Sequence, residues 1–417
     1  MSLRVAMLSV HTCPLAALGS KETGGMNVYV REVSRELARM GVAVDVFTRS
    51  QNPSIPRVVD LAPGARVVHL AAGAQAPMAR ERVWEHLDEF ADRVEAWRLA
   101  EGLDYDVVHA HYWLSGVVGL DLAARWRVPV LQMFHTLARL KNDVARTDAE
   151  REPALRVAEE TRVIAGVSRI VAASEVERMR LVEGYGARRD HVSVVPCGVD
   201  TSLFRPGHAK VARAELDLDD RPTLLYVGRI APIKGLATLL EAVSRLVAKG
   251  RRVRLLVIGG DSDEVIDGHE AYVRDLTCRL GLCDAVEFLG PQPQTALRDY
   301  YVAADMTVMP SFYESFGMVA MEAMACGTPV VATRVGGLAT TVRDGLTGFL
   351  VPEGDITALA ERIDALLGDA GLRATLGAEG VRWAAEHRWP CVADAICREY
   401  ARLQPRAHRY LASTRCR

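Results

Sequence analysis

Two glutamates eight positions apart form the most informative chemical pattern in the chain. Glu314 and Glu322 lie in the segment PSFYESFGMVAMEAMACGTPVV, residues 310–331. In one continuous helix the two carboxylates would lie about 12 Å apart along the axis. The sequence instead predicts that a strand ends near Pro310, that Glu314 lies in a loop and that a helix begins near Phe316. Both carboxylates can then flank a single ligand.

The start of that helix is itself a candidate anion site. The backbone amides of Phe316, Gly317 and Met318 are predicted first-turn donors at the positive end of the helix dipole, where phosphate binds. A ligand with hydroxyl groups and a diphosphate satisfies both the carboxylates and the amides. The alternative is an ordinary amphipathic helix whose glutamates face water, and for the bare spacing alone that alternative is favoured. The surrounding motifs reverse the preference.

The segment resembles the E-x₇-E signature of the retaining family 4 glycosyltransferases, which have the GT-B fold, and its neighbours match in order. GRIAPIKG, residues 228–235, resembles the family's G-R-x…K-G loop. The resemblance implies that Arg229 and Lys234 hold the donor diphosphate. A bidentate guanidinium and a mobile ammonium neutralise two phosphates without a metal ion. The alternative, a solvated surface pair, is disfavoured by the matching context.

The first glycine-rich loop carries a third match. ETGGMNVYVRE, residues 22–32, resembles the family's amino-terminal Gly-Gly loop. The resemblance implies that Gly24 and Gly25 contribute to donor binding, because a glycine lets backbone approach a phosphate closely. It also implies that Asn27 lies near the donor sugar.

The same resemblance assigns roles to the acidic and imidazole side chains. Glu322 is expected to hydrogen-bond the nucleotide ribose, and Glu314 the hydroxyls of the transferred sugar. FHT, residues 134–136, is expected to place His135 beside the reaction centre. The alternative for His135 is a structural residue with satisfied hydrogen bonds after an apolar strand.

These motifs contain no carboxylate that could act as a nucleophile on the opposite sugar face, as double displacement requires. The resemblance implies a reaction on one face, in which the leaving phosphate oxygen helps to deprotonate the acceptor. The protein would then stabilise charge on the departing diphosphate, with Arg229 and Lys234 as catalytic residues beside His135 and Glu314. The expected donor is a UDP-linked sugar carrying a hexosyl or N-acetylhexosaminyl group, and no cofactor or metal ion is expected.

The amino-terminal half carries the expected acceptor residues. HAHYWLSG and FHTLARLKN resemble segments of inositol-phosphate N-acetylglucosaminyltransferases and, more loosely, sucrose-phosphate synthases. VVHLAAGAQAPMARERVWEHLDEF, residues 67–90, resembles a further segment of the synthases. In those relatives a basic residue, a tyrosine, a threonine and an arginine hold an acceptor phosphate. The matching positions are Arg80, Tyr112, Thr136 and Arg156, and Arg80 replaces a lysine of the relatives. We therefore expect a small phosphorylated polyol or sugar as acceptor. The alternative is two surface charges and a packed aromatic ring.

The elements that position these loops alternate between strand and helix. Short apolar runs such as RVAMLSV and VAVDVFT, separated by helical segments, predict βαβ units and parallel sheets. The pattern restarts after a Pro/Gly-containing linker at 196–207. We predict an α/β protein with two facing Rossmann-type domains and a deep cleft between them. The amino-terminal acceptor domain spans 1–198 and is completed by a crossover helix at about 388–417, and the nucleotide-sugar domain spans 199–387.

Composition excludes several broad classes. The 417 residues include 51 Lys and Arg against 53 Asp and Glu, a formal charge of −2, which disfavours a nucleic-acid partner or a basic membrane-surface protein. The sequence contains no apolar run of 18 residues, so no integral membrane segment is predicted. Eight scattered cysteines without zinc spacing favour the cytoplasm. The D-x-D pairs at 217–219 and 261–263 are assigned no metal role, because such pairs are common by chance. A homodimer and peripheral membrane association are left open.

Other functions are weighed against glycosyl transfer to a phosphorylated acceptor. Within the same chemistry, the alternatives are synthase-like glucosyl transfer to a sugar phosphate and transfer to a lipid-linked or natural-product acceptor. A nicotinamide-dependent oxidoreductase is disfavoured because no G-x-G-x-x-G follows the first strand. Nothing in the sequence suggests the pyridoxal phosphate of a phosphorylase. A non-catalytic nucleotide-sugar-binding protein is disfavoured by the intact motif residues.

Overall fold

Two parallel sheets, each flanked by helices, form the framework of the computed structural model, which describes residues 3–16, 24–260 and 268–404. The chain divides into two units. Of the described residues, the first unit contains 3–16, 25–196 and 389–404, and the second contains 24, 197–260 and 268–388. The chain therefore leaves the first unit after Pro196 and returns to it for the last helix, which begins at Trp389.

The sheet of the first unit has eight strands in the order β3-β4-β2-β1-β5-β6-β7-β8. All neighbours pair in parallel except β3 and β4, which form an antiparallel edge. The strands are β1 (Arg4–Leu8), β2 (Ala43–Arg49), β3 (Val58–Ala62), β4 (Ala65–Leu70), β5 (Val107–His111), β6 (Val130–Met133), β7 (Arg169–Ala172) and β8 (Val192–Val194).

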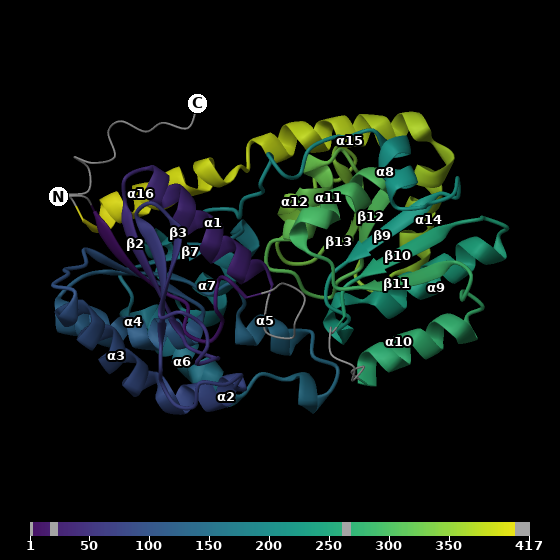
Figure 1. Ribbon diagram of the computed structural model, residues 1–417. Helices are drawn as coiled ribbons and strands as arrows, with labels where there is room; N and C mark the ends of the chain where they lie inside the picture. Colours follow the sequence, from purple (N-terminus) through teal and green to yellow (C-terminus); the bar gives the residue numbers. More distant parts are fainter. Residues whose placement is uncertain (1–2, 17–23, 261–267, 405–417) are drawn as a thin grey trace. The chain divides into compact units, whose positions relative to one another are not determined.

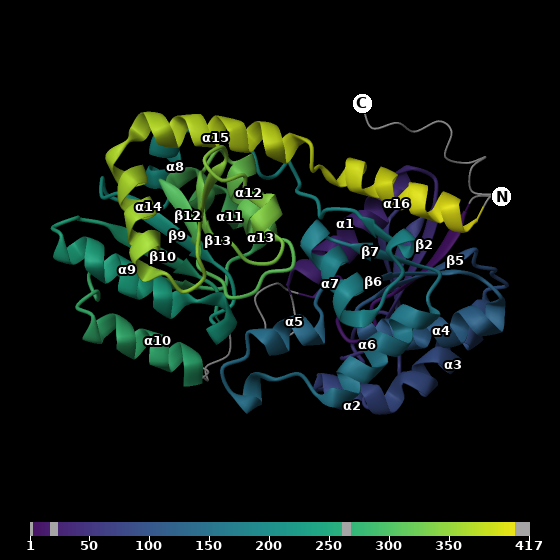
Figure 2. The ribbon, with the colours of Figure 1, turned by 180° about the vertical axis from the view of Figure 1, so that it is seen from behind.

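Helices cover both faces of this sheet, as buried parallel strands require. They are α1 (Gly25–Arg39), α2 (Arg80–Val83), α3 (Leu87–Ala100), α4 (Trp113–Trp126), α5 (Ala138–Asp143), α6 (Ala154–Gly166), α7 (Glu175–Tyr185) and α16 (Trp389–Leu403). Helices α1 and α16 pack together on one face, and α3, α4 and α6 lie on the other (Figure 1, Figure 2).

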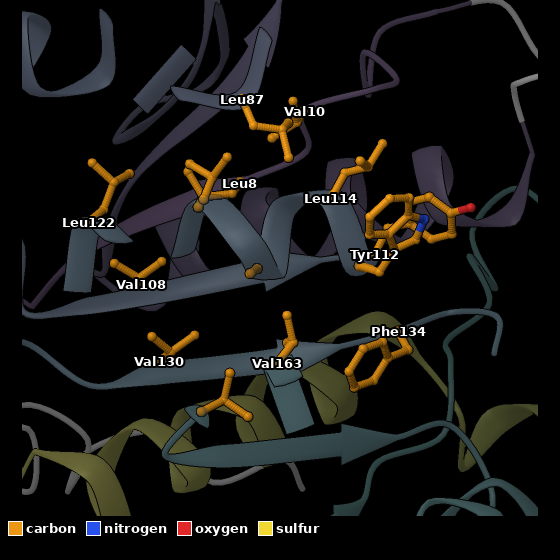
Figure 3. Packing of buried hydrophobic residues seen from close by; sticks show 14 of the residues in the cluster. Leu8, Val10, Leu87, Val108, Tyr112, Leu114, Leu122, Val130, Phe134 and Val163 are labelled. Carbon is orange, nitrogen blue, oxygen red and sulfur yellow. The ribbon is translucent and has the colours of Figure 1, made fainter. Parts of the chain in front are cut away.

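The core of the first unit is built from side chains that alternate along the strands. Figure 3 shows Leu8, Val108 and Val130 of neighbouring strands beside Leu122 of α4 and Val163 of α6. These side chains are at most 2% exposed. This packing fixes the carboxyl ends of the strands, from which the chemical residues project.

The sheet of the second unit has six strands, all parallel, in the order β11-β10-β9-β12-β13-β14. The strands are β9 (Thr223–Val227), β10 (Arg254–Ile258), β11 (Val286–Gly290), β12 (Met306–Met309), β13 (Val330–Thr333) and β14 (Gly348–Val351). The helices are α8 (Ala209–Glu215), α9 (Leu236–Ala248), α10 (Gly268–Arg279), α11 (Gln294–Ala303), α12 (Met318–Ala325), α13 (Leu338–Thr341), α14 (Ile356–Gly368) and α15 (Ala370–Ala385). Side chains of α9, α10 and α14 share one buried cluster with β9 and β10.

Each sheet contains a point at which the order of successive strands reverses. In the first unit it lies between β1 and β5, and in the second between β9 and β12. Open parallel sheets bind ligands outside the carboxyl ends of the strands at such points. The loops that follow these four strands are therefore the places to look for a site.

The predicted α/β class with two parallel-dominated sheets is confirmed. Two strands have no clear strand signal in the sequence, the edge strand β3 and the strand β14. Asp60 interrupts the apolar pattern of β3, and no residue of that strand is fully buried. Strand β14 has only four residues, GFLV, after the turn at 343–347. Neither run carries a signal that distinguishes it from a loop.

Candidate functional site

Two residues directly beyond strands of the first sheet have an unusual backbone conformation. Tyr112 follows β5 with φ 75°, and His135 follows β6 with φ 60°. A positive φ is uncommon for residues other than glycine and is concentrated at functional sites, where surrounding packing maintains the strain. The buried Phe134 and Tyr112 belong to the core cluster (Figure 3), which holds the two turns in place.

The four residues predicted to bind the acceptor lie together at this edge of the first unit. The Arg80 Nη1 donates a hydrogen bond to the Tyr112 hydroxyl at 3.1 Å. The Arg156 guanidinium lies over the Tyr112 ring, 4.8 Å from its centroid, and its Nη2 donates to Thr136 Oγ1 and to the Thr136 carbonyl, each at 3.0 Å. These contacts connect residues from four separate segments of the chain.

A small cavity opens beside this cluster. It has a volume of about 70 Å³, and its lining includes Arg80, Tyr112 and Arg156 together with Glu152. Two indole rings, those of Trp84 and Trp113, also line it and stack with centroids 5.5 Å apart. The cavity therefore combines cationic groups with an apolar wall, an arrangement suited to a small anionic ligand.

Three charged residues of this cluster were not predicted as site residues. Glu152 contacts the side chains of Arg156 and Lys141. Glu160 accepts a hydrogen bond from Arg156 Nε at 2.8 Å and from the Ala138 amide at the start of α5. The signals in the sequence are weak: Lys141 lies inside the FHTLARLKN segment, and the two glutamates flank Arg156 at four-residue spacing. Such spacing is common on solvent-exposed helices.

A row of imidazoles lies behind His135. The His111 Nδ1 is 2.9 Å from His135 Nε2, and the His109 Nδ1 is 2.7 Å from the Tyr400 hydroxyl of α16. Burial lowers the pKa of His135 and of His109 to about 3, and it lowers that of His111 as well. These rings are therefore neutral at physiological pH.

The hydrogen bond between His111 and His135 fixes a tautomer. Buried His111 Nε2 has no hydrogen-bond partner among the described residues. An unpartnered buried N–H is rarer than an unpartnered acceptor, so the proton of His111 belongs on Nδ1, from which it is donated to His135 Nε2. The proton of His135 is then on Nδ1.

The glycine-rich loop continues into α1. Gly25 is the first residue of that helix, and Gly24 precedes it. Asn27 is buried in the first turn, where its Nδ2 donates to Thr12 Oγ1 and to the Cys13 carbonyl, each at 2.7 Å. Asn27 thus joins the start of α1 to the loop after β1. Residues 17–23 of the loop, including the first part of the matched motif, lie outside the described residues.

In the second unit, the two loops beyond β9 and β12 pack directly on each other. A Cβ atom at Gly235 would lie 2.0 Å from the Pro310 carbonyl oxygen, and Gly235 has φ 71°. Only glycine satisfies both conditions. The Phe312 amide donates to the Ile233 carbonyl at 2.8 Å. This close approach brings Lys234 to Glu314, and their Nζ and Oε2 atoms are 2.5 Å apart.

The helix after Glu314 begins later than predicted. Glu314 lies in the loop, as expected, but α12 begins at Met318 and not near Phe316. Gly317 has φ 94°, a left-handed conformation that interrupts the helical backbone just before the first turn. Among the described residues, the amides of Phe316, Gly317 and Met318 donate no hydrogen bond. The three amides expected to bind an anion are therefore present, but the helix that follows them begins two residues later than predicted.

Glu322 lies within α12 and is 7% exposed. Its Oε2 accepts a hydrogen bond from the Tyr301 hydroxyl at 2.8 Å, and its Oε1 accepts from Gln294 Nε2 at 3.3 Å. Burial raises the pKa of Glu322 to about 7, although both hydrogen bonds lower it. The buried carboxyl group of Glu322 therefore gains or loses its proton near neutral pH.

Arg229 and the D-x-D pair at 217–219 lie at the surface. Arg229 is exposed in the loop after β9, and its carbonyl accepts a hydrogen bond from Tyr226. Asp219 of the first D-x-D pair forms ion pairs with Arg221 and Arg254, so its charge is already compensated. The second pair, at 261–263, lies outside the described residues. Within the described ranges no three His, Cys, Asp or Glu side chains are grouped to hold a metal ion.

Comparisons with known families cover both units. Residues 23–203 match the family model described as Glycosyltransferase Family 4, and residues 209–383 match Glycosyl transferases group 1. A D-inositol 3-phosphate glycosyltransferase of Kribbella flavida is 41% identical over 403 residues, 95% of either chain. The D-inositol 3-phosphate glycosyltransferase 2 of Catenulispora acidiphila is 43% identical over 407 residues, 96% of this chain and 95% of the relative.

Solved structures give the same grouping. Sucrose-phosphate synthase from Thermosynechococcus elongatus superimposes with a TM-score of 0.90 at 34% identity, covering 97% of this chain and all of the other. HepE from Anabaena, solved with UDP and glucose, has a TM-score of 0.74 at 20% identity over 96% of this chain and 100% of HepE, which shows the fold alone. The predicted GT-B fold and the predicted family are confirmed. In the described part of the chain, no helix has the length and apolarity that crossing a membrane requires.

Proposed function

The chain belongs to the family 4 glycosyltransferases, and we propose that it transfers a sugar from a UDP-linked donor to a small phosphorylated polyol, with inositol 3-phosphate as the first candidate. The acceptor assignment draws on the relatives named above and on the cluster in the first unit. The observation that carries it is that Arg80, Tyr112 and Arg156 line one cavity and contact one another, while Thr136 accepts a hydrogen bond from Arg156.

The geometry of this cluster suits a phosphate better than a neutral sugar. Arg156 is 2% exposed and is oriented by Glu160, by Thr136 and by the Tyr112 ring. Because folding already holds the guanidinium in one orientation, little further side-chain entropy is lost when a ligand binds. A bidentate anion therefore meets a preformed donor. Arg80, with a side chain 31% exposed, can adjust to the ligand from the rim.

The donor is proposed to bind to the loops of the second unit. Lys234 and Arg229 would contact the diphosphate, and the amides at 316–318 would add uncharged donors. The ion pair between Lys234 and Glu314 keeps the ammonium beside a carboxylate that can bind sugar hydroxyls. Glu322 would accept a hydrogen bond from the ribose in exchange for, or in addition to, that from Gln294.

The proposed reaction retains the anomeric configuration and requires no metal ion. The acceptor hydroxyl attacks the anomeric carbon on the face from which the diphosphate departs. The new C–O bond forms as the bond to the phosphate oxygen breaks, and that oxygen takes the hydroxyl proton. Lys234, Arg229 and the free amides would stabilise the negative charge that develops on the diphosphate. Neutral His135 is proposed to lie beside the donor sugar, where an uncharged imidazole does not compete for the phosphate.

The test is a transfer assay with paired acceptors. Purified protein is incubated with UDP-, GDP- or ADP-sugars and with inositol 3-phosphate, free inositol or a hexose phosphate, and products are identified by mass spectrometry. We expect transfer from a UDP-sugar to inositol 3-phosphate in preference to inositol. Equal transfer to the phosphorylated and free polyols would refute the acceptor assignment, and preference for the hexose phosphate would favour a synthase-like activity.

A matched pair of arginine variants tests the site. Arg80→Ala removes a charge-assisted contact worth about 1.5–3 kcal/mol and should raise the KM for the phosphorylated acceptor at least tenfold. Arg82→Ala is the control, because its side chain is 66% exposed and pairs with Glu85. An unchanged KM in Arg80→Ala, or an equal rise in both variants, would contradict the assignment.

A further inference from the structure

A carboxylate occupies the centre of the cationic cluster in the first unit. The Glu152 side chain is 7% exposed, and it forms an ion pair with Lys141 through Oε1. Its Oε2 is 2.9 Å from Arg156 Nη1, and its Oε1 is 3.8 Å from Arg80 Nη1. Burial raises the pKa of Glu152, but the three cations outweigh burial and lower it to about 2. The side chain is therefore ionised at physiological pH.

Glu152 is not needed to orient Arg156. The Nε of Arg156 donates to Glu160, and its Nη2 donates to Thr136. The remaining nitrogen, Nη1, is buried and has no aligned hydrogen bond among the described residues, although Glu152 lies within ion-pair distance. The Glu152 carboxylate is thus the group that faces Nη1, and it makes no aligned hydrogen bond to it. If the carboxylate moves away, Nη1 becomes a donor for a ligand.

The backbone of Glu152 is held independently of its side chain. The Glu152 amide donates to Asn142 Oδ1 at 2.7 Å, and Asn142 Nδ2 donates to the Glu152 carbonyl at 3.4 Å. Pro153 and the first turn of α6 follow directly. The carboxylate can therefore rotate away from the cations while the chain on either side stays in place.

The charges of the cluster favour a dianion in place of this carboxylate. Arg80, Lys141 and Arg156 together with Glu160 carry a net charge of +2. Glu152 reduces this only to +1, whereas a phosphate monoester is close to a dianion at neutral pH and neutralises the cluster. A phosphate placed beside an ionised Glu152 would be repelled by its like charge, and the repulsion is stronger in a buried site than in water. Charge alone therefore favours the ligand and the carboxylate occupying the site in turn.

We propose that Glu152 is a built-in competitor that occupies the anion position of the acceptor pocket until a phosphate displaces it, and that Lys141 then joins Arg80 and Arg156 as a phosphate ligand. This inference rests on the proposed phosphorylated acceptor. It adds a specificity rule to that proposal: an uncharged polyol cannot replace the carboxylate, so the free polyol does not gain access to the three cations.

The alternative is that Glu152 remains in place and only positions Arg80 and Lys141. The two arrangements predict opposite changes in phosphate-ester affinity when Glu152 is replaced. The full-length protein is titrated calorimetrically with inositol 3-phosphate and, separately, with inorganic phosphate. If Glu152 competes with the ligand, Glu152→Gln binds inositol 3-phosphate at least tenfold more tightly than the wild type. If Glu152 only positions cations, Glu152→Gln binds more weakly. Equal or weaker binding overturns the proposal.

Glu85→Gln is the matched control, because Glu85 is exposed, does not line this cavity and forms an ion pair with the exposed Arg82. Its affinity should stay within about twofold of the wild type. Adding Lys141→Met to Glu152→Gln should lower the affinity at least tenfold, since Lys141 then has only the ligand to bind. Glu152→Ala is the second variant if Glu152→Gln does not fold.

The binding data distinguish this proposal from the proposed function. If the wild type and the Glu152 variants all fail to bind inositol 3-phosphate while transfer to another acceptor is observed, the acceptor assignment fails and the competitor proposal fails with it. If the wild type binds the ester and Glu152→Gln shows no gain, only the competitor proposal fails.

Discussion

Replacement of Glu322 by glutamine should stabilise the second unit in a pH-dependent manner. Glu322 is nearly buried in α12, and burial raises its pKa from 4.5 to about 7. A carboxyl group whose pKa is raised on folding binds more protons in the folded than in the unfolded state between these values. Its ionisation therefore lowers the free energy of unfolding as the pH rises through about 4.5 to 7.

The magnitude follows from the shift. An increase in pKa from 4.5 to about 7 corresponds to about 3 kcal/mol at a pH above both values. Glutamine removes this penalty, which already includes the hydrogen bonds that Tyr301 and Gln294 donate to the carboxylate. The variant should gain about 3 kcal/mol at pH 8 but only about 1 kcal/mol at pH 5, where the native carboxyl group is protonated and only the unfolded one has begun to ionise.

The assay is urea-induced unfolding at pH 5 and pH 8, followed by hydrogen-exchange mass spectrometry of peptides from β12 and α12. Following these peptides measures the second unit by itself, because a chain with two units need not unfold in one transition. Glu361→Gln is the control, since that glutamate is exposed on α14 and should change stability by less than about 0.5 kcal/mol at either pH.

The same substitution should weaken donor binding. If Glu322 binds the ribose, Glu322→Gln should lower the affinity for UDP at least tenfold while stabilising the ligand-free protein, a trade-off expected where a functional group is held in an unfavourable environment. A variant that is destabilised equally at pH 5 and pH 8 would refute the desolvation argument. A stabilised variant with unchanged UDP affinity would refute the ribose role only.

Two further substitutions test the catalytic proposals. Lys234→Ala should reduce kcat 10²- to 10³-fold but change the free energy of unfolding by no more than about 1 kcal/mol, because the ion pair with Glu314 is partly exposed. Steady-state kinetics and urea unfolding measure the two effects, with Lys249→Ala at an exposed lysine as the control. Near-normal turnover would contradict the diphosphate role. His111→Phe should keep the aromatic packing but remove the hydrogen bond that determines which ring nitrogen of His135 carries the proton. We expect a kcat at least tenfold lower and a changed ¹⁵N NMR spectrum of the His135 ring. An unchanged spectrum would show that His111 does not fix the tautomer.

The conformation of the proposed donor loops was largely predictable because it depends on local sequence. Gly235 and Gly317 lie at backbone turns that few other residues can make. Glu314 and Glu322 lie in a loop and in the helix that directly follows it, so one short segment of sequence contains both. The helix boundary was wrong by two residues. The left-handed conformation of Gly317 decides that boundary, and a glycine in the sequence does not reveal its own φ.

The acceptor cluster was only partly predictable. Arg80, Tyr112, Thr136 and Arg156 were identified by their resemblance to known segments, and no spacing rule connects residues this far apart. Lys141 and Glu152 were missed because an isolated lysine and glutamate are ordinarily surface residues. The role proposed for them depends on burial and on their distance from Arg156, which arise only when α5 and α6 pack on each other.

The sequence by itself therefore determined the alternation of strands and helices, the family, and the positions of the glycines and glutamates in the donor loops. These are properties of residue type and of short-range order along the chain. Tertiary structure decided which charges meet. Lys234 and Glu314 are 80 positions apart, and Glu152 lies among three cations from different segments. Electrostatic energies depend on distance and burial, so a charge acquires its role only when the folded chain supplies its neighbours.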